Sequence, residues 1–205
     1  TPGQKMAGQL VVTAVFAYYM AKISDVGLTL KVPFFPNISL NPGWLSIPLL
    51  FFVVIGTVNG TNFTDGLDGL VAVFFSVVAL GTNAGIAPIT LAVVGGLLGF
   101  LLFNVYPASV FMGDTGSLAL GGFVASTAYM MNMPLFLLLV GIIYLVEVLS
   151  VMIQVTYFKV THGKRFFKMA PIHHHFEKCG WSETRVVTVF SIITALCCLV
   201  ALAGI

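Results

Sequence analysis

Long, nearly uncharged runs of apolar residues are the feature that most constrains this chain. A helix needs about 20 predominantly apolar residues to cross a bilayer. We predict seven membrane-spanning helices, at Met6–Ile23, Trp44–Val58, Leu70–Gly81, Pro88–Phe103, Ser117–Met131, Pro134–Phe158 and Val186–Gly204. Only 8% of the residues are charged, against about 25% in soluble domains. The sequence therefore predicts an all-α, polytopic integral membrane helix bundle that forms a single membrane domain over residues 1–205.

Basic residues are distributed unevenly between the predicted loops. Loops rich in Lys and Arg lie on the cytoplasmic side of a membrane. With a cytoplasmic N-terminus, the inside holds Lys5, Lys159, Lys164, Arg165, Lys168, Lys178 and Arg185, and the outside only Lys22 and Lys31. The polar stretches 59–69, 104–116 and 159–185 then share the cytoplasmic face. The Pro-rich stretch 31–44 is predicted to form an extracytoplasmic loop or hairpin.

The first polar stretch, NGTNFTDGLDGL at residues 59–70, carries two carboxylates. Asp65 and Asp68 are three residues apart, on one side of a helical turn. They fit a capping box for the helix that follows. Two carboxylates beside a helix N-terminus also fit a bound cation with a phosphate, because that terminus is itself an anion site.

The second polar stretch, FNVYPASVFMGDTGSLALGG at residues 103–122, repeats this arrangement with Asp114 among glycines. Asp114 is a candidate helix cap and, alternatively, a ligand for Mg²⁺, which prefers carboxylate and phosphate oxygens. Phe111 is an aromatic residue beside it that either stacks on a base or anchors the chain at the membrane interface.

Three consecutive histidines mark the third polar stretch, APIHHHFEKCGWSE at residues 170–183. In an extended backbone His173 and His175 face one way and His174 the other. A zinc site lacks convincing third and fourth ligands here. Hydrogen bonds to a diphosphate fit the triplet better.

The sixth apolar run contains an unusual polar face. Glu147, Ser150 and Gln154 fall on one side of the predicted helix. A carboxylate within a membrane span must face protein or water. It is interpreted either as part of a site or as a structural interhelical hydrogen bond.

Together the motifs resemble the family of bacterial phospho-N-acetylmuramoyl-pentapeptide transferases, a branch of the polyprenyl-phosphate N-acetylhexosamine-1-phosphate transferases. NFTDGLDGL and FNVYPASVFMGDTGSLALGG are typical of the superfamily, and PIHHHFE of the branch. The resemblance covers essentially the whole chain. It implies transfer of phospho-MurNAc-pentapeptide from UDP-MurNAc-pentapeptide to undecaprenyl phosphate, giving lipid I and UMP in peptidoglycan biosynthesis. It also implies Mg²⁺ as cofactor, a homodimer, and a site on the cytoplasmic face of the bacterial inner membrane.

The same resemblance implies a role for individual residues. It makes Asp65, Asp114 and His174 catalytic, with Asp114 the magnesium ligand. It makes Lys5, Asn62, Asp68, Asn104, Phe111, Gln154, His173 and His175 substrate-binding. Within that set, Asp68 and Phe111 correspond to the pair that binds uracil.

One feature of the family is missing from this sequence. The family carries a pair of adjacent aspartates in an earlier cytoplasmic loop, and no Asp-Asp occurs here. The chain begins TPGQKMAGQL, without an initiator Met. We therefore expect it to lack the N-terminal spans of the enzyme, and we do not expect it to catalyse the reaction alone.

Three other functions are compatible with parts of the sequence. The first is the same chemistry with UDP-GlcNAc as donor, which the histidine motif disfavours. The second is an ion-coupled transporter, which predicts acids at mid-helix depth, whereas six of the seven acidic residues lie in loops or at helix ends. The third is a structural subunit, which leaves the clustered Asp and His unexplained. A net charge of +2 without a basic run excludes nucleic acid as a partner.

Overall fold

The chain forms a helical bundle with a small β-hairpin at one end. The computed structural model describes residues 2–62, 68–83, 85–104 and 109–205. In chain order the elements are α1 (Pro2–Lys22), β1 (Leu30–Val32), β2 (Phe35–Leu40), the 3₁₀ helix η1 (Gly43–Leu45), α2 (Ser46–Thr61), α3 (Asp68–Thr82), α4 (Ala87–Asn104), α5 (Gly113–Met130), the 3₁₀ helix η2 (Pro134–Phe136), α6 (Leu137–Val140), α7 (Ile142–Val160), α8 (Ile172–Lys178) and α9 (Glu183–Leu202).

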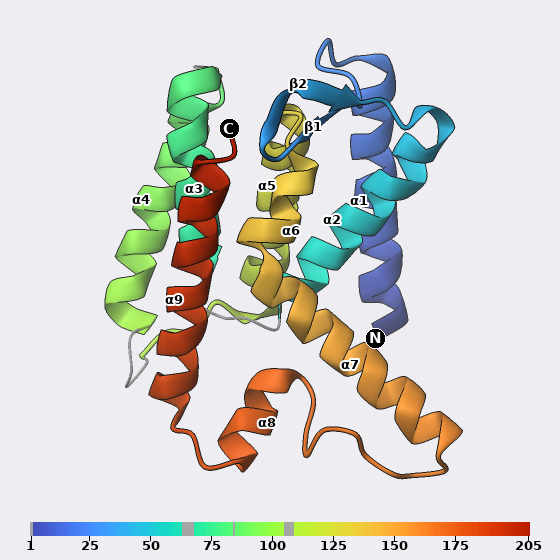
Figure 1. The fold of residues 1–205 in the computed structure, drawn as a ribbon, viewed down its shortest axis with the longest axis vertical. Helices are drawn as coiled ribbons and strands as arrows, with labels where there is room; N and C mark the ends of the chain where they lie inside the picture. Colours follow the sequence, from blue (N-terminus) through green and yellow to red (C-terminus); the bar gives the residue numbers. More distant parts are fainter. Residues whose placement is uncertain (1, 63–67, 84, 105–108) are drawn as a thin grey trace.

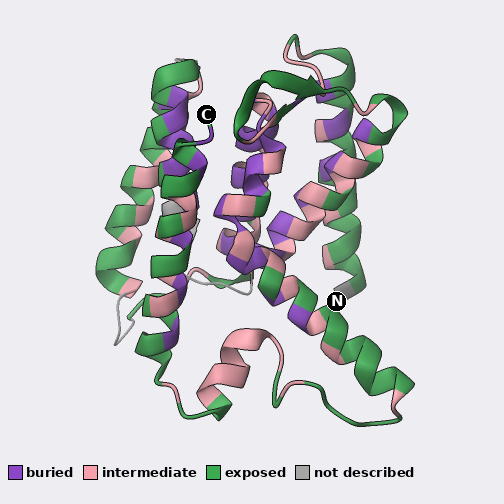
Figure 2. Cartoon of the chain, in the orientation of Figure 1, coloured by how far each residue is buried: buried purple, intermediate pink, exposed green. Residues whose placement is uncertain are grey.

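The outer faces of the helices are apolar, as expected for a surface in contact with lipid. Val12 of α1, Leu102 of α4 and Leu199 of α9 are all exposed, and Figure 2 shows exposed residues along the outside of these helices. Within the described residues, four helical segments are long and apolar enough to cross a membrane: Gly43–Thr61, Ala87–Asn104, Ile142–Val160 and Glu183–Leu202. The chain is therefore a polytopic membrane protein, and the total of seven spans stays a prediction.

Two buried apolar clusters hold the bundle together, and α5 contributes to both. One cluster joins α3, α5, α6 and α9 around residues such as Phe74 and Val140. The other joins α1 and α2 to α5 around Leu50 and Tyr129. Because α5 packs on both sides, it lies at the centre of the bundle (Figure 1).

The Pro-rich stretch contains the predicted hairpin. β1 and β2 pair antiparallel, with Leu30 opposite Leu40. The Phe34 backbone N–H donates to the Gly204 carbonyl at 2.8 Å, which ties the hairpin to the C-terminal end of α9. The N-terminus of α1 and helix α8 lie at the other end of the bundle (Figure 1). The histidine-bearing helix α8 and the Lys5 end of α1 therefore lie at the end of the bundle opposite the hairpin.

The prediction of one continuous helix over 134–158 is wrong. The chain forms η2 and α6, breaks at Gly141, and continues as α7 in a different direction (Figure 1). A Cβ at Gly141 would lie 2.7 Å from the Leu137 carbonyl oxygen, so the tight break there needs a glycine. Sharp kinks in helices are commonly found at such residues. The consequence is that α7 runs obliquely and carries its polar face toward α8.

Candidate functional site

The hydrogen bonds at the end of the bundle remote from the hairpin form two polar clusters, the first of which centres on Asp114. Lys5, in the first turns of α1, donates from Nζ to Asp114 Oδ2 at 3.1 Å. Lys5 lowers the pKa of the Asp114 carboxyl through this hydrogen bond and through its charge, and a hydrogen bond from Asn62 lowers it further. The Asp114 side chain is 71% exposed. It is therefore an ionised, accessible carboxylate.

Asn62 connects this carboxylate to the packing between α2 and α5. Its Oδ1 accepts from Ser117 Oγ at 2.6 Å. One residue earlier, Thr61 Oγ1 donates to the Ser117 carbonyl at 3.0 Å, where the two helices cross closely at Gly121. Lys5, Asn62 and Asp114, distant in sequence, are thus brought together by α1, α2 and α5.

The interpretation of Asp114 as a helix cap is wrong. α5 begins at Gly113, earlier than the predicted Ser117, so Asp114 lies inside the first turn. The N-cap position is Met112, and no side chain caps it. A carboxylate in a first turn still interacts favourably with the positive end of the helix dipole. Its side chain is left for Lys5, Asn62 and solvent.

The remaining residues predicted near this cluster are described only in part. Asp65 lies outside the described residues, and for Asp68 the structure gives only its backbone, at the start of α3. Asn104 ends α4 and donates from Nδ2 to the Val110 carbonyl at 2.9 Å. Phe111 is 73% exposed. The Asn104 hydrogen bond therefore holds Val110, the residue next to Phe111.

The second polar cluster contains the three histidines, and the expectation of an extended backbone for them is wrong. They lie on α8, which spans Ile172–Lys178. His174 Nδ1 is 2.8 Å from Glu177 Oε2. His175 Nδ1 accepts from the Lys168 backbone N–H at 3.1 Å. No group of three or more potential metal ligands occurs among the described residues.

Glu147 and Gln154, on the polar face of α7, hold α8 and the segment that leads to it. Glu147 is fully buried. Its Oε2 accepts from the Ile172 N–H at 3.0 Å, and its Oε1 lies 3.1 Å from His173 Nδ1. Gln154 Oε1 accepts from the backbone N–H groups of Phe166 and Phe167 at 3.2 and 2.9 Å.

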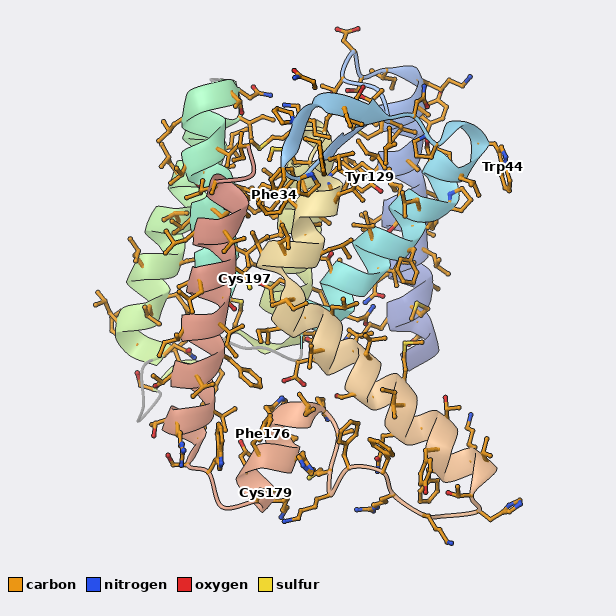
Figure 3. All side chains as sticks on the ribbon, viewed as in Figure 1. Phe34, Trp44, Tyr129, Phe176, Cys179 and Cys197 are labelled. Atoms are coloured by element: carbon orange, nitrogen blue, oxygen red, sulfur yellow. The ribbon has the colours of Figure 1, made fainter. Side chains whose placement is uncertain are left out.

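These contacts define the course of the stretch 159–185. Glu147 lies thirteen positions before Val160, the last residue of α7, or about 20 Å along a helix at 1.5 Å per residue. The chain after α7 therefore folds back along it instead of remaining beyond its end. On the other side of α8, the Phe176 ring, labelled in Figure 3, stacks on Trp181 with centroids 4.9 Å apart and meets Phe190 of α9 edge-on at 6.2 Å. Helix α8 is thus held from both sides.

A cavity of about 420 Å³ opens between α7 and this returning segment. Its lining residues are Val151, Gln154, Val155, Phe158, Lys159, Arg165, Met169 and Ala170. The wall is mostly apolar and carries two cations, so it suits a group that is both anionic and partly apolar.

Residue-by-residue reasoning missed Ser117 as a member of the Asp114 cluster, and it missed Lys159 and Arg165 as lining residues of the cavity. Ser117 was only the first residue of a predicted span, whereas its hydroxyl donates to Asn62 from another helix. Lys159 and Arg165 were used only to orient the chain in the membrane. Both residues lie close in sequence to the polar face of α7 that carries Gln154, and this proximity could have indicated that they line a common cavity.

Comparison with known proteins gives one family and a set of similar relatives. Residues 1–132 match the model of glycosyl transferase family 4. Proteins called phospho-N-acetylmuramoyl-pentapeptide-transferase are similar over nearly all of the chain. The one from Clostridium perfringens is 49% identical over 100% of this chain and 66% of its own length. The one from Acetivibrio thermocellus is 52% identical over 96% and 62%. The chain thus spans just under two thirds of the length of these relatives.

Proposed function

Because this chain belongs to glycosyl transferase family 4, we propose that it forms part of a phospho-N-acetylmuramoyl-pentapeptide transferase. The reaction is transfer of phospho-MurNAc-pentapeptide from UDP-MurNAc-pentapeptide to undecaprenyl phosphate, which yields lipid I and UMP. The support from relatives is identity of about half the residues across nearly the full chain. The support from the molecule is that motifs distant in sequence form two polar clusters at one end of a membrane bundle.

One observation carries the proposal most directly. The exposed carboxylate of Asp114, on α5, is bonded by Lys5 of α1 and by Asn62 at the end of α2. A structural ion pair needs only two of these groups. An ionised carboxylate that remains accessible beside a cation is suited to binding a diphosphate together with its counter-ion.

The oxygen chemistry at Asp114 fits Mg²⁺. The ion is octahedral, keeps several waters, and is usually held by one or two carboxylates together with substrate phosphates. Asp114 Oδ2 bonds Lys5, and the high exposure of the side chain leaves room for water and phosphate oxygens. A Mg²⁺ ion held by Asp114 would neutralise the negative charge that develops on the leaving phosphate.

The chain's own residues then have separate tasks. A phosphate oxygen of the lipid carrier attacks the phosphorus bonded to the sugar; the new P–O bond forms as the diphosphate bridge breaks, and UMP leaves. Lys5 lies where it can balance charge on the diphosphate. His174 has Nδ1 engaged by Glu177, so its Nε2 is the nitrogen available to a phosphate oxygen. The lipid phosphate is already anionic, which favours direct attack.

Residues around the two clusters would bind the rest of the substrates. Asp65 is a second catalytic carboxylate in this proposal, and Asp68 with Phe111 binds the uracil. Asn62 and Asn104 line the nucleotide pocket. The mostly apolar cavity, with Lys159 and Arg165 in its wall, would bind an anionic and partly apolar portion of a substrate. His173, His175 and Gln154 hold or contact the sugar-phosphate end.

We place this site at the cytoplasmic face of the bacterial inner membrane, in a homodimer. The placement rests on the excess of Lys and Arg at the polar end of the bundle. Residues 1–205 act as one membrane domain, together with the portion of the relatives that this chain does not match.

Donor specificity tests the proposal. The chain would be joined to the part of its Clostridium perfringens relative that it does not match, giving what we term the completed protein. This protein and the chain alone would be reconstituted in vesicles containing undecaprenyl phosphate and Mg²⁺. UMP release would then be measured with UDP-MurNAc-pentapeptide and with UDP-GlcNAc.

We expect release from the muramoyl donor by the completed protein, and little from the chain alone. Release from UDP-GlcNAc instead would assign the chain to the other donor class. A folded, completed protein that releases UMP from neither donor would refute the proposal.

A further inference from the structure

The carboxylate of Glu147 is fully buried in α7 and is not accounted for by the proposed chemistry. We propose that Glu147 is a positioning residue for the histidine helix: it anchors the first residue of α8 and fixes the proton of His173 on Nδ1, so that the ring meets substrate through Nε2. The part concerning substrate rests on the proposed function. The part concerning anchoring and the ring proton does not.

The anchoring follows from the geometry at the start of α8. The first backbone N–H groups of a helix have no partner within the helix. The N-cap of α8 is Pro171, and no side chain of α8 caps the helix. Glu147 Oε2 accepts the Ile172 N–H at 3.0 Å, so the missing cap comes from a different helix. A carboxylate also complements the positive end of the α8 dipole.

The proton position follows from the second oxygen of the same carboxylate. Oε1 lies 3.1 Å from His173 Nδ1. An ionised carboxylate has only acceptor sites, so the imidazole nitrogen facing it must carry the hydrogen. In this arrangement the bond made by one nitrogen decides the role of the other. Nε2 of His173 is thereby left as the nitrogen that can accept or exchange a proton.

The neighbouring histidines show that this setting is specific to each ring. His174 has its Nδ1 against Glu177 at 2.8 Å, so it shares the arrangement of His173. His175 Nδ1 instead accepts the Lys168 N–H, which places its proton on Nε2. The His173 and His174 rings have centroids 4.0 Å apart. Nε2 of His173 and of His174 therefore lacks a proton, whereas Nε2 of His175 carries one and lies 3.8 Å from Cys179 Sγ.

Glu147→Gln separates the two roles, because glutamine keeps an oxygen for the Ile172 N–H and turns an amide N–H₂ toward His173. That donor requires Nδ1 to accept, and so moves the ring proton to Nε2. Glu147→Ala removes both contacts. Ser150→Ala is the matched control: Ser150 is buried on the same face, and its hydroxyl donates only to the Glu147 carbonyl within α7.

Three readouts would be taken on the completed protein. The first is ¹⁵N NMR of histidine-labelled protein, to which this chain contributes four histidines and in which His173→Gln assigns the His173 signals. The second is amide hydrogen exchange at Ile172. The third is kcat and KM for UMP release.

We expect His173 to carry its proton on Nδ1 in the parent protein and on Nε2 in Glu147→Gln. Exchange protection at Ile172 should survive in Glu147→Gln and be lost in Glu147→Ala. We expect kcat of Glu147→Gln to fall roughly 10- to 100-fold with KM within about twofold, the range for partners that orient a functional histidine. Ser150→Ala should match the parent.

Two results would overturn the inference. One is a His173 ring that lacks a proton on Nδ1 in the parent or does not change in Glu147→Gln. The other is a kcat of Glu147→Gln equal to that of the parent. If the parent releases no UMP while the NMR and exchange results hold, the proposed function fails and the anchoring stands.

Discussion

The close crossing of α2 and α5 at Gly121 makes a quantitative prediction about how the Asp114 cluster is held. A Cβ added at Gly121 would lie 2.7 Å from Val58 Cα and 3.2 Å from the Thr57 carbonyl oxygen. Carbon atoms in contact are ordinarily about 3.5–4.0 Å apart. Because these are backbone atoms, α2 must move by close to an ångström, and no side-chain rotation relieves the clash.

Gly121→Ala should therefore be destabilising. Overpacking of this kind costs about 1–3 kcal/mol, offset by up to about 1 kcal/mol for replacing a helical glycine with alanine. Gly122→Ala is the matched control, because nothing lies within 4 Å of its Cβ position while the helix-propensity gain is the same. The difference between the two variants isolates the clash.

Thermal unfolding in detergent measures this difference. At roughly 2–4 °C per kcal/mol for a chain of this size, Gly121→Ala should unfold several degrees below Gly122→Ala. The displacement of α2 should also separate Asn62 from Ser117, 2.6 Å apart in the parent, and lower activity. Equal melting temperatures for the two variants would refute the close crossing.

Further predictions concern the contacts of Gln154 and of Lys5. Gln154→Leu should speed amide exchange at Phe166 and Phe167, whose N–H groups it bonds; unchanged exchange would contradict this role. Lys5→Met should raise the pKa of Asp114, which Lys5 now lowers. Because folding lowers the pKa of Asp114, its ionised form stabilises the folded protein above the ordinary carboxyl pKa range. This stabilisation is lost as the pH falls through the lowered pKa. Binding of Mn²⁺, followed by EPR, should accordingly decline at a higher pH in Lys5→Met; an identical profile would show that Lys5 does not act on Asp114.

Sequence patterns predicted the membrane bundle because span length and hydropathy are local properties. The hairpin was indicated by prolines and asparagines at residues 31–44, and β1 and β2 lie there. The position of the α7 break was not predicted, since Gly141 lies within an uninterrupted apolar run. Its effect depends on crowding against Leu137, which hydropathy does not report.

The sequence indicated which types of residue form the candidate site, but it did not indicate how these residues are arranged. Carboxylates and histidines in polar stretches indicated phosphate chemistry. The extended conformation assumed for His173–His175 was wrong, because the caps that stabilise α8 come from Glu147 on another helix. A cap supplied by tertiary structure leaves no local signature. Likewise, nothing near Asp114 in sequence reveals that Lys5 is its partner.

The most direct test of the account is whether the exposed carboxylate of Asp114 is needed for the reaction. Mg²⁺-dependent UMP release from UDP-MurNAc-pentapeptide would be compared in the completed protein, in Asp114→Asn and in Asp25→Asn. Asp25 is an exposed acid at the far end of α1 from Lys5, so it controls for loss of one negative charge. The account predicts a fall of roughly 100-fold or more for Asp114→Asn and no change for Asp25→Asn. Full activity in a correctly folded Asp114→Asn protein would contradict it.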